Sequence, residues 1–445
     1  MNQEDIADGF KMTELGPLPE EWQVVRLGDV AEKMKAGGTP SRKESSYWKG
    51  NVPFVLIEDL TSCNLYLTKT NEFITEEGLN NSSAWIVPAR SILLSMYGTI
   101  GEAAINVIPV ATNQAIVAII PKQSLYPEYG AYILKFYARK LSTYNIQSTQ
   151  KNVNKGIVEK FLIPLPPLPE QQKIAAVLSA VQEAKEKTEG VIRATRELKK
   201  SMMKHLFTYG PVPVKEIENV KLKETEIGQI PEHWQVVRLG DVLQLMRNGL
   251  TYRQERNHKG VPVTRIETIS EGNINPNKVG YISGLDKSQI EKYRLLPGDI
   301  LFSHINSEPH LGKTAIYQGN PPLILHGMNL LLLRTHPSVS DPYFLYYFLN
   351  HERAKGTFIG IAARAVGQSS INMGKLRNLP IFLPPLPEQQ KIAEMMSAVD
   401  EKIRAEESKK KALEVLFKTL LHDLMTAKVR VHNLNIQRID KGRVS

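Results

Sequence analysis

Short runs of aliphatic and β-branched residues, separated by polar turns, fill the stretch between Trp22 and about Leu165. Four of these runs predict β-strands: Gln23–Leu27, Val52–Ile57, Ser91–Ser95 and Ala115–Ile120. Aromatic and aliphatic residues recur at helical spacing over Tyr129–Leu141 and again over Tyr343–His351, which predicts a helix in each place. The pattern is typical of mixed α+β domains of about 145 residues, an ordinary size for one compact unit.

A different pattern follows each domain, where a proline-rich segment opens a long stretch of helical periodicity. The first such segment is Pro164–Pro169, whose fixed backbone angles suit an extended entry and a helix start at Pro169 or Glu170. Alternating three-and-four spacing then marks Val177, Val181, Ala184, Thr188, Val191, Thr195, Leu198 and Met202. The second copy repeats this spacing at Ile392, Met396, Val399, Ile403, Leu413, Phe417, Leu420 and Leu424, with Glu406 and Lys410 interrupting.

This narrow apolar stripe is typical of a coiled-coil seam. A helix of about 40 residues measures about 60 Å, and Gly190 should cost the first helix roughly 1 kcal/mol. An isolated helix of that length would leave its stripe in water, so we expect the two helices to pair antiparallel with the domains at opposite ends. In the alternative arrangement each helix packs on its own domain, which calls for a broader apolar face.

The chain is a tandem duplication. The string WQVVRLGDV at Trp22–Val30 recurs unchanged at Trp234–Val242, and PPLPEQQKIA at Pro166–Ala175 recurs unchanged at Pro384–Ala393. Chance does not produce identities of this length in the same order. Between these markers the copies diverge but keep a skeleton of short apolar runs, as two domains that read different targets would need. Drift after duplication would leave a similar pattern.

The repeats define five segments. We expect an N-terminal target-reading domain over residues 1–165, a first spacer helix over 166–209, a linker and second domain over 210–383, a second spacer helix over 384–427 and a C-terminal tail over 428–445. The fold class is therefore α+β, with two tandem globular domains separated by two long antiparallel helices and an internal pseudo-two-fold repeat.

Composition places the chain among soluble proteins. Among the 445 residues, 42% are apolar and the net charge is +10, a mild excess that fits a nucleic-acid partner without requiring one. Cys63 is the single cysteine, which excludes an intrachain disulfide and favours a reducing compartment. The first residues lack the apolar core of a signal peptide, and no apolar run approaches the roughly 20 residues of a membrane span. We therefore expect a cytoplasmic protein with no membrane partner.

Motifs for catalysis are weak. The string Leu311–Thr314 resembles the end of a phosphate-binding loop, but Ser307 stands where that loop requires glycine. No glycine-rich dinucleotide fingerprint follows a strand. His304 and His310 lack a compact zinc spacing, and we expect them to face solvent or DNA. Carboxylate pairs such as Glu58 and Asp59 are expected to be solvated surface charges.

Hydrogen-bond donors gather in loops of both repeats. Arginine, asparagine and glutamine read base edges through bidentate contacts, while lysine, serine, threonine and backbone amides hold phosphates. The candidate DNA-binding residues of the first domain are Thr39, Ser41, Arg42, Lys43, Tyr47, Lys49, Gln147, Gln150, Lys151 and Asn152. Those of the second are Arg247, Asn248, Tyr252, Arg253, Arg256, Lys259, His304, Asn306, Arg364, Gln368, Ser369 and Asn372. The candidate base readers among them are Arg42, Gln150, Arg253 and Gln368. Any single loop is equally well explained as a solvated polar turn.

These residues resemble the specificity subunit of Type I restriction-modification systems. The resemblance is carried by the tandem layout, the two PPLPEQQKIA strings, Gly37-Gly-Thr-Pro40 and Asn113-Gln114, and it covers nearly the whole chain. The second domain departs from it, with Asn248-Gly-Leu-Thr251 where the first has Gly-Gly-Thr-Pro, which puts in doubt any transfer of contacts between the copies.

The resemblance implies two target-recognition domains, each reading one half of a bipartite, asymmetric site on double-stranded DNA. It implies that the helices entered at Glu170 and Glu388 fix the gap between the halves and dock partners. Those partners are two modification subunits that bring S-adenosylmethionine and adenine methylation, and ATP-driven restriction subunits with Mg²⁺. This chain would hold no cofactor, metal or catalytic residue. Two other functions stay open from the residues: a non-catalytic coiled-coil scaffold that binds proteins, and a self-sufficient methyltransferase.

Overall fold

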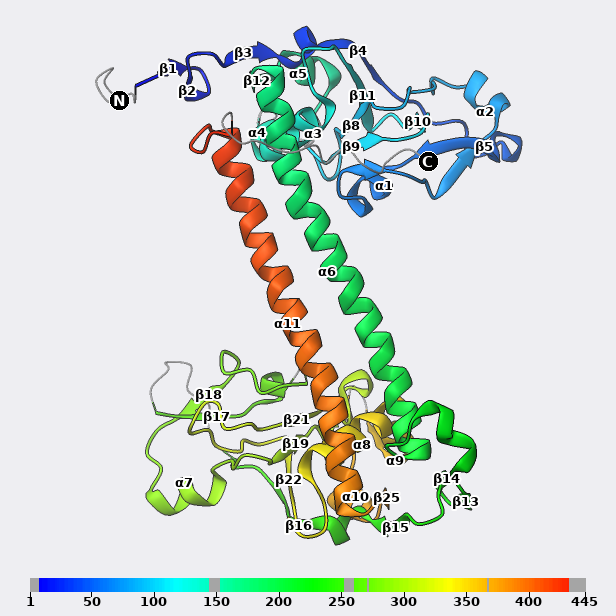
Figure 1. Ribbon diagram of the computed structural model, residues 1–445, viewed down its shortest axis with the longest axis vertical. Coiled ribbons are helices and arrows are strands. Elements are labelled where there is room, and N and C mark those ends of the chain that lie inside the picture. Colours follow the sequence, from blue (N-terminus) through cyan, green and yellow to red (C-terminus); the bar gives the residue numbers. More distant parts are fainter. Residues whose placement is uncertain (1–7, 144–152, 252–259, 270–271, 366–367, 432–445) are drawn as a thin grey trace. The chain divides into compact units, whose positions relative to one another are not determined.

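The computed structural model describes residues 8–143, 153–251, 260–269, 272–365 and 368–431. The chain forms two compact units: unit 1 comprises Met1–Gly190 and Glu407–Ser445, and unit 2 comprises Val191–Glu406. Both units mix helices and strands, which confirms the expected α+β class (Figure 1). Two long helices, α6 at Leu168–Tyr209 and α11 at Leu386–Met425, contribute residues to both units.

The centre of unit 1 is a five-stranded sheet with the order β4-β11-β8-β9-β6. Its strands are β4 (Ala31–Ala36), β6 (Tyr66–Leu67), β8 (Ile92–Ser95), β9 (Ala103–Asn106) and β11 (Ile116–Pro121). Strand β8 is buried on both faces, because Ile92 and Leu94 pack into one apolar cluster and Leu93 into another on the opposite face. Its sequence is accordingly a continuous apolar run rather than an alternating one.

Smaller sheets and helices surround this centre. The remaining strands of unit 1 are β1 (Phe10–Thr13), β2 (Gly16–Pro19), β3 (Gln23–Arg26), β5 (Trp48–Val55), β7 (Glu72–Ile74), β10 (Ala111–Thr112) and β12 (Leu162–Leu165). Its short helices are α1 (Ile57–Ser62), α2 (Glu76–Asn80), α3 (Pro127–Phe136), α4 (Ala138–Thr143) and α5 (Lys155–Lys160). Antiparallel pairing of β3 with β12 joins the first repeated string to the segment that leads into α6.

Unit 2 repeats this plan around a four-stranded sheet with the order β16-β22-β19-β21, whose strands are labelled in Figure 1. The strands of unit 2 are β13 (Leu222–Thr225), β14 (Gly228–Pro231), β15 (Gln235–Arg238), β16 (Leu243–Asn248), β17 (Val261–Val263), β18 (Gly280–Ile282), β19 (Ile300–Phe302), β20 (Ile305–Asn306), β21 (Thr314–Ile316), β22 (Leu331–Thr335), β23 (Ala363–Ala365), β24 (Gln368–Ser370) and β25 (Pro380–Leu383). Its short helices are α7 (Lys287–Tyr293), α8 (Pro342–Ala354), α9 (Thr357–Ile361) and α10 (Met373–Arg377).

Two predicted elements of unit 1 differ from the structure. The helix expected over Tyr129–Leu141 is two helices, α3 and α4, with a break at Tyr137 that lets its ring pack edge-on against Phe161. The apolar stripe continues across this break, so the periodicity did not reveal it. The strand expected to end at Ile57 ends at Val55, because α1 begins at Ile57.

The start of α1 also corrects the expectation for Asp59. Its carboxylate accepts hydrogen bonds from the backbone N–H of Leu56 at 2.8 Å and from the Asn71 side chain at 2.9 Å, and the residue is only 3% exposed. A carboxylate in the first turn of a helix satisfies donors that have no partner within the helix. Asp59 is therefore a buried cap and not a solvated surface charge.

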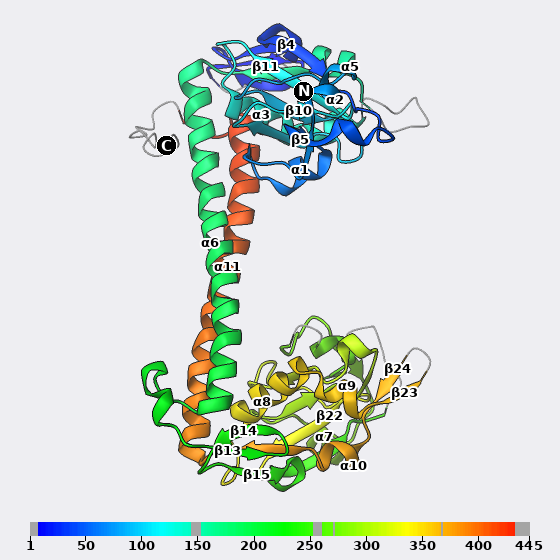
Figure 2. The ribbon, with the colours of Figure 1, turned by 90° about the vertical axis from the view of Figure 1, so that its right-hand side faces the viewer.

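The antiparallel pairing of the long helices is confirmed within each unit (Figures 1 and 2). In unit 1 Lys410 lies 3.0 Å from Glu189, and in unit 2 Lys199 lies 2.5 Å from Asp400. The predicted seam of α11 is confirmed, since its positions are turned inward and even the interrupting Glu406 is only 8% exposed. Helix α6 begins at Leu168, one residue before the earlier of the two predicted starts.

The predicted seam of α6 is wrong at two of its positions in unit 2. Val191 and Leu198 are 39% and 55% exposed, whereas the neighbouring Ile192 is 6% exposed. At these two turns the inward residue lies one position further along the helix, at Ile192 and at Lys199, whose ammonium pairs with Asp400. Thr195 and Met202 are half-buried, as the predicted seam requires. A polar residue at an inward position breaks the apolar period, so the sequence pattern pointed to the adjacent ridge.

Candidate nucleic-acid interface

The residues that are identical in the two repeats build a structural junction. Trp22 is fully buried, and its indole Nε1–H donates to Glu170 at 2.9 Å. Trp234 does the same to Glu388 at 3.0 Å. Each tryptophan comes from the first repeated string and each glutamate from the second, so the bond ties the start of a domain to the start of its long helix.

The glutamine after each of these glutamates completes the junction. Gln171 accepts from the backbone N–H of Tyr126 and donates to the Ser124 and Pro166 carbonyls. Gln389 accepts from Asp341 and donates to Val339 and Pro384 in the same way. Both amides are buried and fully used. The junction requires these residue types, which accounts for their being identical in the two repeats. Residues that distinguish DNA sequences are therefore expected where the two repeats differ.

A close crossing of the backbone follows the edge strand of each central sheet. Gly37 lies so close to Thr112 that any Cβ would overlap the Thr112 carbonyl, and Gly249 has the same relation to Gly327. The structure therefore aligns Gly249 with Gly37, one residue out of step with the comparison of the two strings above. In this register Thr251 matches Thr39, but the second domain still departs from Gly-Gly-Thr-Pro, with Leu250 in place of Gly38 and Tyr252 in place of Pro40. Beyond the crossing, the exposed Thr39 donates from Oγ1 to Gln114 Oε1 at 2.5 Å.

A cation stacked on an aromatic ring stands beside each crossing. The fifth residue of β4 is Lys35, whose ammonium lies 5.4 Å from the centre of the Trp85 ring, and Lys33 lies 4.5 Å from the same ring. The fifth residue of β16 is Arg247, whose guanidinium lies 5.0 Å from the centre of the Tyr293 ring. Cation–π contact restricts a long side chain without neutralising it. Unit 1 thus holds two lysines on one ring, and unit 2 holds one half-buried arginine, whose Nη2 also donates to the Lys292 carbonyl. Lys35 and Arg247 occupy the same position of their strands.

The candidate residues of unit 1 between Thr39 and Lys49 lie in one exposed stretch before and at the start of β5. Thr39, Ser41, Arg42, Lys43 and Lys49 are exposed and Tyr47 is half-buried. Arg42 is held by Glu72 at 2.7 Å, and its guanidinium lies 3.7 Å from the centre of the Trp48 ring. Salt bridging and stacking fix its plane, which bidentate reading of a base requires.

The structure brings together two candidate segments of unit 2 that lie far apart in sequence. Strand β24 pairs with both β20 and β23, placing Asn306 opposite Ser369 and Arg364 opposite the same serine. Gln368 is exposed at the start of β24, while Ser369 is buried. Arg364 pairs with Glu308 at 3.0 Å. Asn306 donates from Nδ2 to Ser303 at 3.1 Å.

His304 does not face solvent, which corrects the expectation for it. It is 8% exposed, and burial lowers its pKa to about 4. His326 is fully buried and its pKa is lowered to about 3, also by burial, so both imidazoles are neutral at physiological pH. Neither Nδ1 has a hydrogen-bond partner in the described structure. The shift acts on the charged form, which loses its water when the ring is buried.

Several candidate residues lie outside the described residues: Gln147, Gln150, Lys151, Asn152, Tyr252, Arg253, Arg256 and Lys259. The first four are followed at once by Val153, whose N–H donates to the Met96 carbonyl at 3.1 Å. Ile371 makes the equivalent bond to His304 in unit 2 at 2.8 Å. In unit 2 this bond follows β24 directly.

Asn372 has a structural partner that its sequence context did not reveal. Its Oδ1 accepts from the Lys375 N–H at 2.7 Å and caps α10, as Asn154 caps α5 through Ile157 at 3.0 Å.

We expect Asn372→Ala to lower the free energy of unfolding by about 1 kcal/mol. Asn372→Asp keeps a cap oxygen but removes the amide donor, so stability should be kept while DNA affinity falls. Urea unfolding and DNA titration of both variants, with Asn154→Asp as the matched control, separate the two roles. Unchanged DNA affinity in Asn372→Asp would leave this residue as a cap alone.

Lys35, Trp85 and Tyr293 were not predicted from the sequence as candidate contacts, and Gln114 was named there only for the family resemblance. Aligning the two repeats through their shared strings pairs Lys35 with Arg247, which was already a candidate DNA-binding residue. This alignment could have identified Lys35 from the sequence. No group of His, Cys, Asp and Glu side chains suited to a metal ion occurs within the described ranges. In those ranges, too, every helix is too short or too polar to pass through a lipid bilayer.

A duplicated α+β domain, whose copies share one pair of long antiparallel helices, defines a tandem two-domain class of protein. Residues 19–194 and 231–415 match the family described as Type I restriction modification DNA specificity domain. The chain therefore belongs to the specificity subunits of type I restriction-modification systems, and its two units carry the two target-recognition domains.

Individual relatives are similar over different lengths. A protein of Methanocaldococcus jannaschii named for the type I restriction enzyme MjaX specificity subunit is 50% identical over 210 residues, which are 47% of this chain and 49% of that protein. The MjaVIII specificity subunit of the same organism is 29% identical over 94% of this chain and 95% of its own. A crystal structure of the type I S subunit from M. genitalium has the same fold, with a TM-score of 0.59 at 14% identity over 91% of this chain and 96% of that one.

Proposed function

We propose that each unit reads one half of a split, asymmetric sequence on double-stranded DNA, and that the long helices set the gap between the halves. The chain supplies no catalytic group and no cofactor of its own. S-adenosylmethionine comes with two modification subunits, and ATP and Mg²⁺ come with restriction subunits. One observation carries this proposal. Both units keep the same junction, glycine crossing and stacked cation, while the donor-bearing segments around them differ.

The stacked cations fit a contact that both half-sites share. Phosphates are the same in every sequence, so a residue that holds one needs only a fixed positive charge. Lys35 and Arg247 are such charges at equivalent places. The groups that differ between the units, Arg42 and Gln114 in unit 1 and Gln368 and Asn306 in unit 2, are of the types that distinguish bases.

Exposed apolar side chains on the long helices support the docking role. Large apolar groups in water mark surfaces that bind other proteins when they gather on one element. The exposed ones on α6 and α11 are Leu168, Val191, Leu198, Met395, Val415 and Leu416. Modification subunits that cover them would also bring the methyl-transfer chemistry that this chain is proposed to lack.

The test of the proposal is the pattern of methylated adenines in a host that expresses this chain with its modification partner. We expect a split sequence with a fixed gap, and no methyl transfer from labelled S-adenosylmethionine to DNA by the purified chain alone. Methylation by the chain alone would establish a self-sufficient methyltransferase instead. A complex with no effect on DNA, and no salt-sensitive DNA affinity, would leave a protein-binding scaffold.

Removing a stacked cation should weaken DNA binding without changing the sequence preference. For Lys35→Ala and Arg247→Ala in the complex, we expect the slope of log affinity against log salt to become shallower by about 0.9 each, because one phosphate contact is lost. Affinity for cognate and unrelated duplexes should fall by a similar factor. Fluorescence anisotropy over a salt series measures both. Lys200→Ala, which removes an exposed lysine of α6 paired with Glu197, is the matched control and should leave the slope unchanged. An unchanged slope in Lys35→Ala and Arg247→Ala would assign these residues to folding rather than to DNA.

A further inference from the structure

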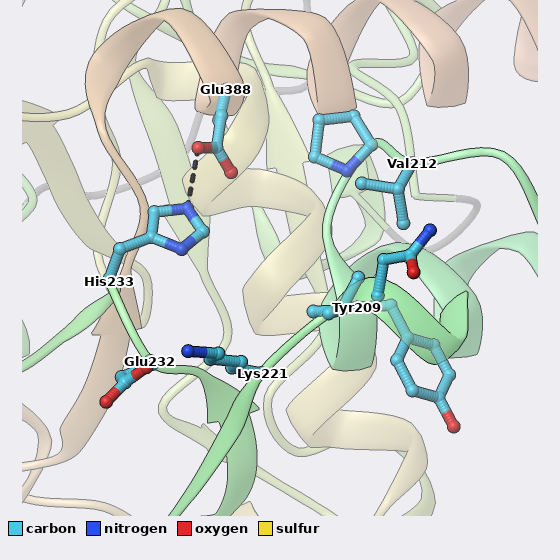
Figure 3. Close-up of a pocket in the computed structure, with 9 residues that line it drawn as sticks. Tyr209, Val212, Lys221, Glu232, His233 and Glu388 are labelled. Carbon is cyan, nitrogen blue, oxygen red and sulfur yellow. Dashed lines mark hydrogen bonds and ion pairs between the residues drawn. The ribbon is translucent and has the colours of Figure 1, made fainter. Parts of the chain in front are cut away.

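Unit 2 has a cavity beside the start of α11, with a volume of about 770 Å³ (Figure 3). Its lining includes Tyr209, Val212, Lys221, Glu232, His233 and Glu388. Figure 3 shows the dashed bond between His233 and Glu388, which measures 2.7 Å from Nε2 to Oε1. Glu388 is one of the two repeated glutamates of the junction, and its other oxygen accepts from Trp234.

An arginine occupies the equivalent place in unit 1. Arg430 donates to both oxygens of Glu170, from Nε at 2.8 Å and from Nη2 at 3.0 Å, and Nη2 also reaches Glu21 at 2.5 Å. Its guanidinium lies 5.8 Å from the centre of the Trp22 ring. The Glu170 side chain is 5% exposed beneath this arginine, whereas the Glu388 side chain is 29% exposed.

The chain itself shows why unit 2 has no such arginine. Helix α11 is followed by Ala427 in the left-handed conformation, with φ of 54°, and Arg430 stands three residues later. Helix α6 is followed by Gly210 in the same conformation, with φ of 82°. The register shared by the two copies of PPLPEQQKIA places Val212, which lines the cavity, at the position of Arg430. Valine has no charge and no donor to offer a carboxylate. Unit 2 therefore has the carboxylate acceptor, Glu388, but no arginine of its own to donate to it.

In unit 2 His233 takes the place of this arginine, and it is a weaker hydrogen-bond partner for the carboxylate. It stands immediately before Trp234, as Glu21 stands before Trp22, so a second acid of the unit 1 site has become an imidazole. The His233 side chain is 56% exposed and makes one bond to Glu388. A guanidinium would make two parallel bonds to the same carboxylate, which is the stronger arrangement. The valine walls at Val212 and Val220 suit the aliphatic stem of an arginine.

We propose that this cavity receives an arginine side chain from a modification subunit of the assembly, with the guanidinium displacing His233 from Glu388. The identity of the donor as a subunit of the same complex rests on the proposed function above. The site gives unit 2 an additional point of attachment beside the start of α11. Unit 1 has no such vacant site, because Arg430 of the same chain already occupies it.

The test uses the full-length chain and the blocked pentapeptide Ala-Lys-Val-Arg-Val, which has the sequence of residues 427–431. We expect calorimetry to give one site per chain, since Glu170 is already occupied. Affinity should fall at least ten-fold in Glu388→Gln, rise in His233→Ala, and vanish for a peptide with glutamine in place of arginine. Equal binding to Glu388→Gln, or no binding at millimolar peptide, would overturn the proposal. His233→Ala and the altered peptide keep the test valid even if Glu388→Gln weakens the fold.

The second arm identifies the source of the arginine. The assembled complex with modification subunits should no longer bind the peptide, because the cavity is then occupied. Peptide binding that persists in the complex would show that those subunits do not fill the site, and the proposal would fail. DNA affinity measured on the same preparations separates this outcome from the proposed function. Peptide binding that persists in a complex with intact DNA binding counts only against the cavity. Peptide binding that is lost in a complex with no DNA affinity counts only against DNA reading.

Discussion

Removing residues 190–196 from α6 together with residues 403–409 from α11 should shorten the gap between the two methylated half-sites by about three base pairs. Seven residues span about 10 Å of helix, and base pairs are stacked about 3.4 Å apart. Two turns of helix are removed, so each remaining side chain keeps its face to within about 20°. The Glu189–Lys410 and Lys199–Asp400 pairs lie outside the removed residues and can hold the shortened helices in register.

Methylated adenines in a host that expresses the shortened chain measure the new gap. Loss of all methylation is also compatible with helices that set the gap, provided that the purified variant remains folded by circular dichroism. A variant with five residues removed from each helix is the control, because it turns the remaining helix by about 140° and should abolish methylation. If the seven-residue variant methylates at the original gap, the helices do not set it.

Gly37→Ala and Gly249→Ala should each destabilise their own unit by about 3 kcal/mol. In both cases the added Cβ would overlap a backbone carbonyl, that of Thr112 or of Gly327, which cannot move aside as a flexible side chain can. Overpacking of this kind costs typically 1 to 3 kcal/mol, and a rigid neighbour places it at the upper end. The crossing also positions Thr39 against Gln114, so DNA affinity should fall before unfolding is complete.

Urea unfolding followed by tryptophan fluorescence measures these losses. Trp22, Trp48 and Trp85 report on unit 1 and Trp234 on unit 2, so the affected unit can be told apart. Gly190→Ala is the matched control: nothing lies within 4 Å of its added Cβ, and alanine in a helix interior should stabilise by about 1 kcal/mol. A Gly37→Ala variant as stable as the parent would mean that the crossing is looser than the structure has it.

The sequence predicted the parts of the fold that leave a periodic or repeated trace. Identical strings revealed the duplication, and apolar spacing located the α11 seam because its inward residues are mostly apolar. Inward polar residues leave no such trace. Lys199 shifted the apparent seam of α6, and the burial of Asp59 and His304 depends on neighbours that are distant in sequence or position. Local pattern therefore failed where a polar group is satisfied by tertiary contacts.

The candidate interface was predicted by residue type and not by arrangement. Loops rich in arginine, asparagine and glutamine were correctly selected as exposed segments for Arg42 and Gln368, yet nothing in the sequence showed that β20 and β24 pair. Lys35 and Trp85 were missed because a single lysine and a single tryptophan carry no motif. Their role becomes apparent only beside Arg247 and Tyr293 in unit 2, once Lys35 and Arg247 are known to occupy the same position of equivalent strands.

The division of unit 1 between the two ends of the chain has a consequence for biosynthesis. Unit 2 is one continuous stretch, Val191–Glu406, and can fold as soon as it leaves the ribosome. Unit 1 lacks Leu424, Met425 and Arg430 until the residues that follow unit 2 have been synthesised, so part of its core and the Glu170 carboxylate stay uncovered until then. Of the two units, the one whose synthesis begins earlier is thus completed later, and a chain cut short before residue 424 would carry a finished unit 2 attached to an unfinished unit 1.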